Sequence, residues 1–86
     1  MKKYELNPIF DGSKSFYKKA NVLEDGSKKA LISYSTKVAE IIDGVAIVYG
    51  TYSKTTLRHI REFLRQNGFM ANNKAQIECD YMKGAA

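Results

Sequence analysis

Four basic residues are spaced so that they share one side of a predicted helix. This is the arrangement in the sequence that is best suited to chemistry. They are separated by four, three and four positions: Lys54, Arg58, Arg61 and Arg65. At about 100° per residue, these positions fall within a band of about 60° on an α-helix. Like charges repel at this spacing, so folding alone does not favour the arrangement. The band is either a solvated helix face or a surface that binds phosphate groups or an acidic patch of a protein.

Residues that could carry catalysis are scarce. His59 is the only histidine and Cys79 the only cysteine, and no serine is spaced to meet His59, so we expect a partly exposed helix histidine. Glu78 and Asp80 are two positions apart on a predicted helix and therefore diverge. No group of residues has metal-ligand spacing, and no glycine-rich phosphate loop is present. The sequence predicts no catalytic residue, no metal and no cofactor, in a protein that is not an enzyme.

Tyrosines form the second candidate set, with six in the sequence and no tryptophan. Four of them lie in or at the ends of predicted strands: Tyr17, Tyr34, Tyr49 and Tyr52. Aromatic rings beside cations can stack on the bases of single-stranded nucleic acid or anchor a protein interface. The alternative is that these rings half-fill a small core. The predicted binding residues, for protein or nucleic acid, are Lys54, Arg58, Arg61, Arg65, Lys18, Lys19, Tyr34 and Tyr52.

The sequence marks both ends of the helix that must hold the four cations. Ser53 is a good N-cap, because its hydroxyl can accept a hydrogen bond from an amide of the first turn. Gly68 favours a helix stop, because glycine adopts positive φ without a steric penalty. An apolar stripe lies between these two positions: Leu57, Ile60, Phe63 and Leu64. We expect this stripe to be buried against a sheet.

Segments rich in β-branched and aromatic residues are expected to form that sheet, namely 15–23, 28–42 and 45–51. The segment 28–42 is long for one strand, and its alternation changes phase across 33–36, which predicts a bend or bulge there. The segment 45–51 is almost continuously apolar, which favours a central strand. Hairpin turns are predicted at Asp25-Gly26 and Asp43-Gly44.

The two ends of the chain carry weaker signals. Residues 1–14 contain Pro8 and an Asp-Gly-Ser turn, so we expect an irregular lead-in. Residues 75–83 are compatible with a short helix capped by Asn73. The sequence therefore predicts a single α+β domain over residues 1–86. Its expected architecture is a small antiparallel sheet of three to four strands packed against one main helix, with a short second C-terminal helix.

Composition and charge indicate a small, basic, soluble protein. The chain has 86 residues and a formal net charge of +5, and no apolar run approaches the ~18 residues of a membrane span. The excess charge lies in residues 1–23, with five lysines against two acids, and in residues 51–68, with four cations against one. The two N-terminal lysines precede no apolar segment, so we expect no secretory signal and a cytoplasmic location.

Three segments resemble parts of small bacteriophage proteins that have no assigned chemistry. They are YSTKVAEI at 34–41, DG at 43–44 and YSKTTLRHIREFLRQ at 52–66. The last is similar to the Tyr-Ser-x-Thr-Thr-x-Arg-His-Ile helix start of those proteins. The resemblance covers residues 31–69 and implies a short phage accessory gene. Products of such genes often inhibit host machinery by binding, as anti-CRISPR proteins do, although a basic chain does not fit a DNA mimic.

Three functions are compatible with these observations. The first is a phage-type inhibitor that binds a host defence protein or ribonucleoprotein, such as a Cas effector, in the cytoplasm of the infected bacterium. The second is a DNA- or RNA-binding protein whose affinity falls with salt, and both of these use the cations of the predicted helix. The third is a virion assembly protein in which a free edge strand, such as residues 15–23, allows homo-oligomers. We expect no membrane partner.

Overall fold

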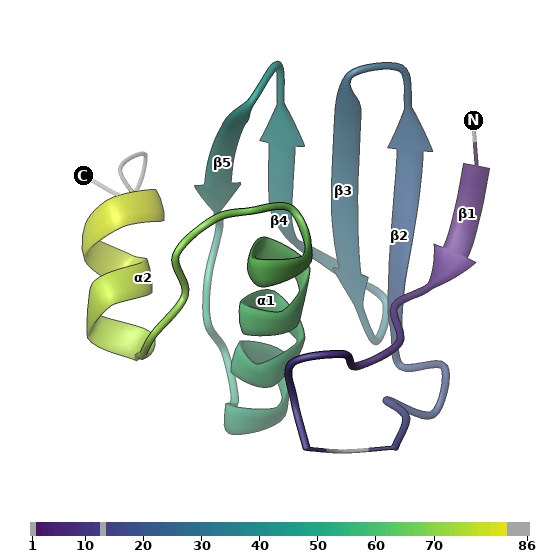
Figure 1. Ribbon diagram of the computed structural model, residues 1–86, viewed down its shortest axis with the longest axis horizontal. Coiled ribbons are helices and arrows are strands. Elements are labelled where there is room, and N and C mark those ends of the chain that lie inside the picture. The colour runs from purple at the N-terminus through teal and green to yellow at the C-terminus, as the bar shows by residue number, and fades with distance from the viewer. Residues whose placement is uncertain (1, 13, 83–86) are drawn as a thin grey trace.

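A five-stranded antiparallel sheet and two helices make up the fold in the computed structural model, which describes residues 2–12 and 14–82. The strands are β1 (Lys2–Glu5), β2 (Ala20–Asp25), β3 (Lys28–Ser33), β4 (Thr36–Ile42) and β5 (Val45–Val48). Each strand pairs with the next along the chain, so the sheet order is β1-β2-β3-β4-β5. The helix α1 (Lys54–Gln66) packs against β3 and β4, and α2 (Lys74–Tyr81) lies beside β5 (Figure 1).

The expectation of three to four strands packed against one main helix is wrong, because the sheet has five strands among the described residues. Residues 2–5, expected to be irregular, form β1 and pair with β2, with Tyr4 opposite Val22. The segment expected to be one long strand folds into two, because Ser33 pairs with Thr36 and the chain reverses between them. Tyr34 makes this turn with a φ of 59°, a conformation that bulky residues rarely adopt and that sequence patterns do not indicate.

Two further strand predictions are wrong in position. β5 is an edge strand and not a central one, and its apolar run is explained by the core on one side and by the neighbouring α2. β2 begins at residue 20, because the chain turns at Tyr17 and Lys18, which both have positive φ. β2 also pairs on both sides, with β1 and β3, so residues 15–23 do not provide the free edge on which the assembly hypothesis rested.

The ends of α1 are as predicted, and its buried face is broader than predicted. Ser53 Oγ accepts a hydrogen bond from the Thr56 amide at 3.2 Å. After the helix, the Gly68 and Phe69 amides bond back to the carbonyls of residues 65 and 64, and Gly68 has a φ of 83°. Six residues of α1 are buried: Ile60, Phe63 and Leu64 are apolar, and Thr56, His59 and Glu62 are polar. The polar members of this face require partners elsewhere in the chain.

The second helix also begins where the sequence indicates. Asn73 Oδ1 accepts a hydrogen bond from the Gln76 amide at 2.9 Å, and Ile77 is the buried residue of the helix. The predicted end of this helix at residue 83 lies outside the described residues. No helix in the described part of the chain is long and apolar enough to span a membrane.

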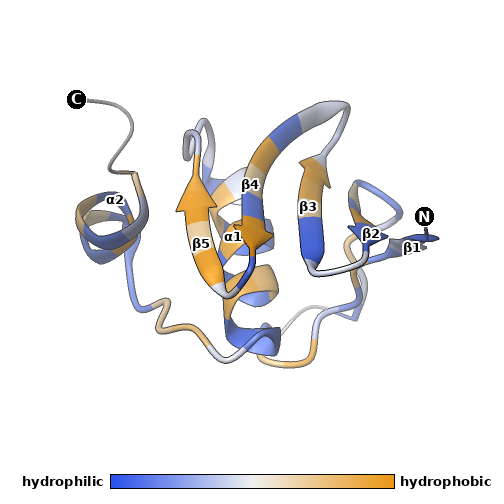
Figure 2. Cartoon of the chain, turned by 90° about the horizontal axis from the view of Figure 1, so that it is seen from above, coloured by the Kyte–Doolittle hydropathy of each residue, from blue (hydrophilic) through white to orange (hydrophobic). Residues whose placement is uncertain are grey.

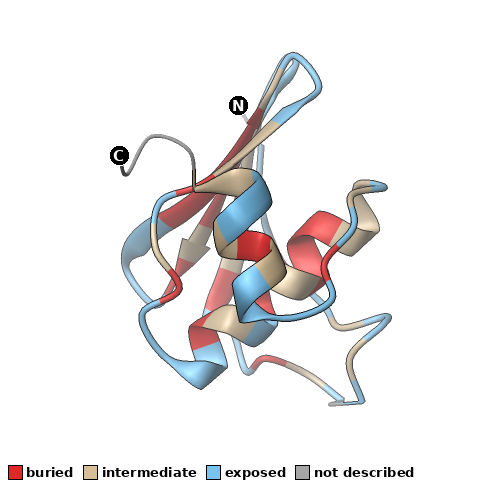
Figure 3. Cartoon of the chain, turned by 90° about the vertical axis from the view of Figure 1, so that its left-hand side faces the viewer, coloured by how far each residue is buried: buried red, intermediate tan, exposed pale blue. Residues whose placement is uncertain are grey.

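One hydrophobic core lies between the sheet and α1. Four cross-strand neighbours, one from each of β2 to β5, form its central row: Val22, Leu31, Ala39 and Val48. Each of these side chains is at most 2% exposed, and they belong to the same cluster as Ile60, Phe63 and Leu64 of α1. Hydrophobic residues dominate β5, whereas α1 shows both hydrophobic and hydrophilic residues (Figure 2). Buried residues concentrate in the strands and α1, while the hairpin ends are exposed (Figure 3).

Candidate functional site

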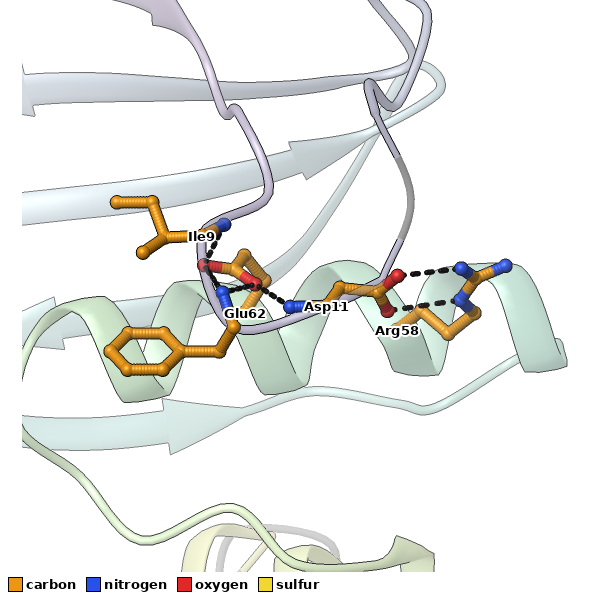
Figure 4. A network of polar contacts seen from close by, with 5 residues as sticks. Ile9, Asp11, Arg58 and Glu62 are labelled. Atoms are coloured by element: carbon orange, nitrogen blue, oxygen red, sulfur yellow. Dashed lines mark hydrogen bonds and ion pairs between the residues drawn. The ribbon is translucent and has the colours of Figure 1, made fainter.

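A buried carboxylate on α1 holds the N-terminal loop against the helix. Glu62 is 1% exposed, and its carboxylate oxygens accept hydrogen bonds from the backbone amides of Ile9, Phe10 and Asp11, each at 2.9 Å (Figure 4). The side-chain amide of Gln66 donates a fourth bond, at 2.6 Å. Consecutive amides that converge on one anion provide local positive charge without using a cationic side chain. The charge of Glu62 is therefore balanced mainly by the backbone.

The same loop brings an acid to the first arginine of the helix. Asp11 accepts two hydrogen bonds from Arg58, at 3.0 Å from Nε and 2.6 Å from Nη2 (Figure 4). This is the parallel two-bond geometry that suits guanidinium and carboxylate groups. The contact raises the pKa of Arg58, through the hydrogen bonds first and the charge of Asp11 second. The Arg58 guanidinium is thus held in place at the end of the loop.

Three arginines line one polar hollow of about 200 Å³ between the loop and α1. We call it the arginine hollow, and its residues are Phe10, Asp11, Gly12, Arg58, Arg61, Glu62 and Arg65. Arg65 is oriented by a hydrogen bond from its Nε to the Ala71 carbonyl at 2.9 Å. The Nε of Arg61 is buried and has no hydrogen-bond partner within the described residues. Guanidinium groups that line one hollow can bind phosphate or carboxylate through paired N–H groups.

A second hollow, of about 210 Å³, adjoins the first and shares Arg58 with it. We call it the tyrosine hollow, and its residues are Ser15, Phe16, Tyr17, Lys19, Tyr34, Thr55, Arg58 and His59. Tyr17 is 74% exposed and Tyr34 is 51% exposed, so neither ring fills the core. Lys19 Nζ lies 5.7 Å from the centre of the Tyr34 ring. The cations of α1 are therefore continuous with an exposed aromatic surface.

His59 forms part of the floor of the tyrosine hollow and is buried, which corrects the expectation of a partly exposed residue. It is 1% exposed, its Nδ1 lies 2.9 Å from Ser33 Oγ, and its ring packs edge-on against Phe16. Burial lowers the pKa of His59, and repulsion by Arg58 adds to that effect. Ser33 is itself 2% exposed, so the serine hydroxyl beside this histidine is closed to a substrate. The pair therefore supports the fold, joining β3 to α1.

A third cluster lies on the sheet face that points away from α1. Glu40 is 3% exposed and accepts a hydrogen bond from the Tyr49 hydroxyl, with Lys28 Nζ and Lys37 Nζ each 3.2 Å from its carboxylate. Burial alone would raise the pKa of Glu40, but the Tyr49 hydrogen bond and the two ammonium groups outweigh it, so this pKa is lowered. We call Lys28, Lys37, Glu40 and Tyr49 the Glu40 cluster. Its cations are already paired with an acid of the chain.

The structure brings most of the predicted binding residues together, but not all of them. Arg58, Arg61 and Arg65 line the arginine hollow, while Lys19 and Tyr34 line the tyrosine hollow. Three other predicted residues do not line either hollow: Lys18, Tyr52 and Lys54. Tyr52 and Lys54 line a separate hollow with Lys74, and Lys18 is exposed.

Sequence reasoning missed the acids of the arginine hollow. Asp11 and Glu62 come from segments about fifty positions apart, and no local pattern connects them. One signal was available: Glu62 lies beside the apolar stripe of α1, and a buried carboxylate needs several donors. Tyr17 lines the tyrosine hollow from a turn and not from the predicted strand, and the predicted binding residues do not include it. Among the described residues, no group of three or more His, Cys, Asp or Glu side chains is arranged to hold a metal ion.

The chain belongs to a family described as a family of unknown function, DUF8033, whose model matches residues 4–79. The matched range includes every residue of the arginine hollow, the tyrosine hollow and the Glu40 cluster. The chain matches no curated protein and no solved structure. The family assigns no activity, so the functional argument rests on the geometry of the chain itself.

Proposed function

We propose that this protein acts by binding nucleic acid, with the phosphate groups in the arginine hollow. The observation that carries the proposal is the convergence of Arg58, Arg61 and Arg65 on one polar hollow. Paired N–H groups of guanidinium match the oxygens of a phosphate better than the point charge of a lysine does.

The acids of the hollow do not remove this capacity. Glu62 is bonded to three backbone amides and to Gln66, so the arginines are not needed to balance it. The Arg58 side chain that Asp11 engages is 48% exposed, so water screens the ion pair. A phosphate can therefore compete with Asp11 for Arg58 while Arg61 and Arg65 add to the attraction.

The resemblance to phage proteins supplies a setting for this binding. The motif at 52–66 that carries the resemblance contains all three arginines of the hollow. In that setting the protein is a small phage-type inhibitor of host defence machinery, acting in the cytoplasm of the infected bacterium. Its target is a defence ribonucleoprotein, such as a Cas effector complex, and it makes contact through the nucleic acid of that complex.

The direct test is binding of a fluorescently labelled 15-nucleotide DNA at 50 and 200 mM salt, measured by anisotropy. Three phosphate contacts predict that log affinity falls against log salt with a slope of about −2. The variant Arg61→Gln should bind about tenfold more weakly, because charge-assisted hydrogen bonds are lost. The matched control is Lys54→Gln, which removes the same charge from α1 outside the hollow and should change the affinity less than about twofold.

Two results would refute this function. One is the absence of binding at low salt by a correctly folded protein. The other is an equal loss of affinity in Arg61→Gln and Lys54→Gln, which would show that net charge acts without the hollow.

A further inference from the structure

The turns beside the tyrosine hollow keep two tyrosines in an unfavourable backbone conformation. Tyr17, Lys18 and Tyr34 have φ values of 53°, 64° and 59°, in the left-handed region. Each such residue is strained relative to ordinary backbone, and glycine or asparagine would relieve part of that strain. These are three of the five non-glycine residues with positive φ in the described part of the chain. Strain of this kind concentrates at functional sites.

Backbone hydrogen bonds fix these two turns against each other. The Lys19 amide donates to the Phe16 carbonyl at 3.0 Å, and the Tyr34 amide donates to the Lys19 carbonyl at 2.6 Å. The Tyr17 amide donates to Ser15 Oγ at 2.9 Å. Hydrogen bonds therefore hold the backbone turns of Tyr17 and Tyr34 in place. Both rings are exposed and lie outside the hydrophobic core.

The floor of the tyrosine hollow is aromatic, and its rim is cationic. Phe16 is 6% exposed and packs on the buried His59 ring, which is also 6.0 Å from the Tyr34 ring, centre to centre. Lys19 lies over Tyr34, and Arg58 belongs to both hollows. A flat ring that carries a phosphate would find an aromatic surface in one hollow and guanidinium groups in the next. An unpaired nucleotide has this combination of groups.

We propose that the tyrosine hollow is a stacking site for an unpaired base, so that the nucleic acid bound by this protein is single-stranded. The inference rests on the proposed function, because the arginine hollow holds the adjacent phosphates. In a duplex the faces of the bases are stacked on one another and cannot enter the hollow. Stacking on tyrosine depends little on which base is present, so the site selects for single strands and not for sequence.

The test compares three labelled probes with equal numbers of phosphates per strand: 15-nucleotide oligothymidylate, a fully abasic 15-mer, and a 15-base-pair duplex. We expect oligothymidylate to bind about tenfold more tightly than the abasic strand, because one or more bases stack on the tyrosines. Since the protein has no tryptophan, tyrosine emission can be followed directly and should be quenched by oligothymidylate but not by the abasic strand.

The variants are Tyr17→Asn and Tyr34→Asn, because asparagine accepts positive φ and preserves the turns. Each should lower the affinity for oligothymidylate severalfold, towards that of the abasic strand, and leave the salt dependence unchanged. The matched control is Tyr52→Asn. Tyr52 is exposed too, at 67%, and has a positive φ of 46°, but it lies outside the hollow. This control should bind as the parent protein does.

The outcomes separate the two proposals. Equal, salt-dependent binding of oligothymidylate and the abasic strand would overturn the stacking site and leave the arginine hollow standing. Duplex bound as tightly as oligothymidylate, or equal losses in Tyr34→Asn and Tyr52→Asn, would also overturn it. Failure to bind any of the three probes would overturn the stacking site together with the proposed function.

Discussion

The described part of the chain buries two glutamates, and it stabilises them in opposite ways. Glu62 on α1 is held by backbone amides, whereas Glu40 on the other side of the sheet is held by two lysines and a tyrosine. The type of hydrogen-bond donor determines whether the nearby cationic side chains are needed to balance the buried carboxylate. Around Glu40 the lysines pair with the buried acid itself, while around Glu62 the arginines line an open hollow and Arg58 pairs with Asp11 instead. Under the proposed function, the lysines of one face stabilise the fold and the arginines of the other face bind nucleic acid.

The largest effect is expected from replacing the acid that orders the arginine hollow. Glu62→Gln places a side-chain N–H₂ opposite backbone amides that need an acceptor and removes the charge that they stabilise. We expect a loss of about 2–4 kcal/mol in the free energy of unfolding, a large fraction of the stability of a small domain. Urea unfolding at pH 7 measures this loss.

The equivalent change on the other face should cost less. In Glu40→Gln the side-chain oxygen still accepts from Tyr49, and the half-exposed Lys28 and Lys37 remain hydrated, so we expect about 1–2 kcal/mol. This variant should also keep its affinity for DNA. An equal or greater loss of stability in Glu40→Gln than in Glu62→Gln would contradict the difference drawn between the two faces.

The smallest effect is a dependence of stability on pH that separates His59 from the carboxylates. The folded pKa of His59 is lowered below its ordinary value of 6.5, so the unfolded chain takes up the proton first as the pH falls. The stability due to neutral His59 is complete above about 6.5 and is lost as the pH falls through the folded pKa. The lowered pKa of Glu40 gives a second loss only as the pH falls through 4.5 and below.

Urea unfolding at pH 7, 6 and 5 can resolve the first of these losses, because His59 is the only histidine. The variant His59→Asn can still hydrogen-bond to Ser33, and its stability should vary less over this range than that of the parent protein. A parent stability that does not change between pH 7 and pH 5 would contradict the buried, neutral histidine.

Local signals predicted the features whose causes lie within a few residues. The N-caps Ser53 and Asn73 satisfy amides three positions away, and Asp43-Gly44 forms its hairpin turn with two positive φ values. These bonds do not depend on the position of the rest of the chain, so the neighbouring residues are sufficient to predict them. The same holds for the spacing of the helix arginines, which places them on one side of α1.

Features that depend on distant partners could not be predicted in this way. β1 forms because β2 offers it an edge, although residues 2–5 are largely exposed and carry little strand pattern. The turn at Tyr34 divides an apparently continuous strand, and its positive φ accompanies a hydrogen bond from the Tyr34 amide to the distant Lys19 carbonyl. The arginine hollow exists only because residues 9–11 reach Glu62. Each of these is a tertiary effect that outweighs the local preference.

The most direct test of the division between the two faces is a map of backbone amide chemical shifts during titration with 15-nucleotide oligothymidylate. We predict that the shifts change at residues 9–12, 17–19 and 58–65 and at Tyr34, with little change at Lys28, Lys37 and Tyr49. Changes centred on the Glu40 cluster, or no change at a DNA concentration several times that of the protein, would contradict it.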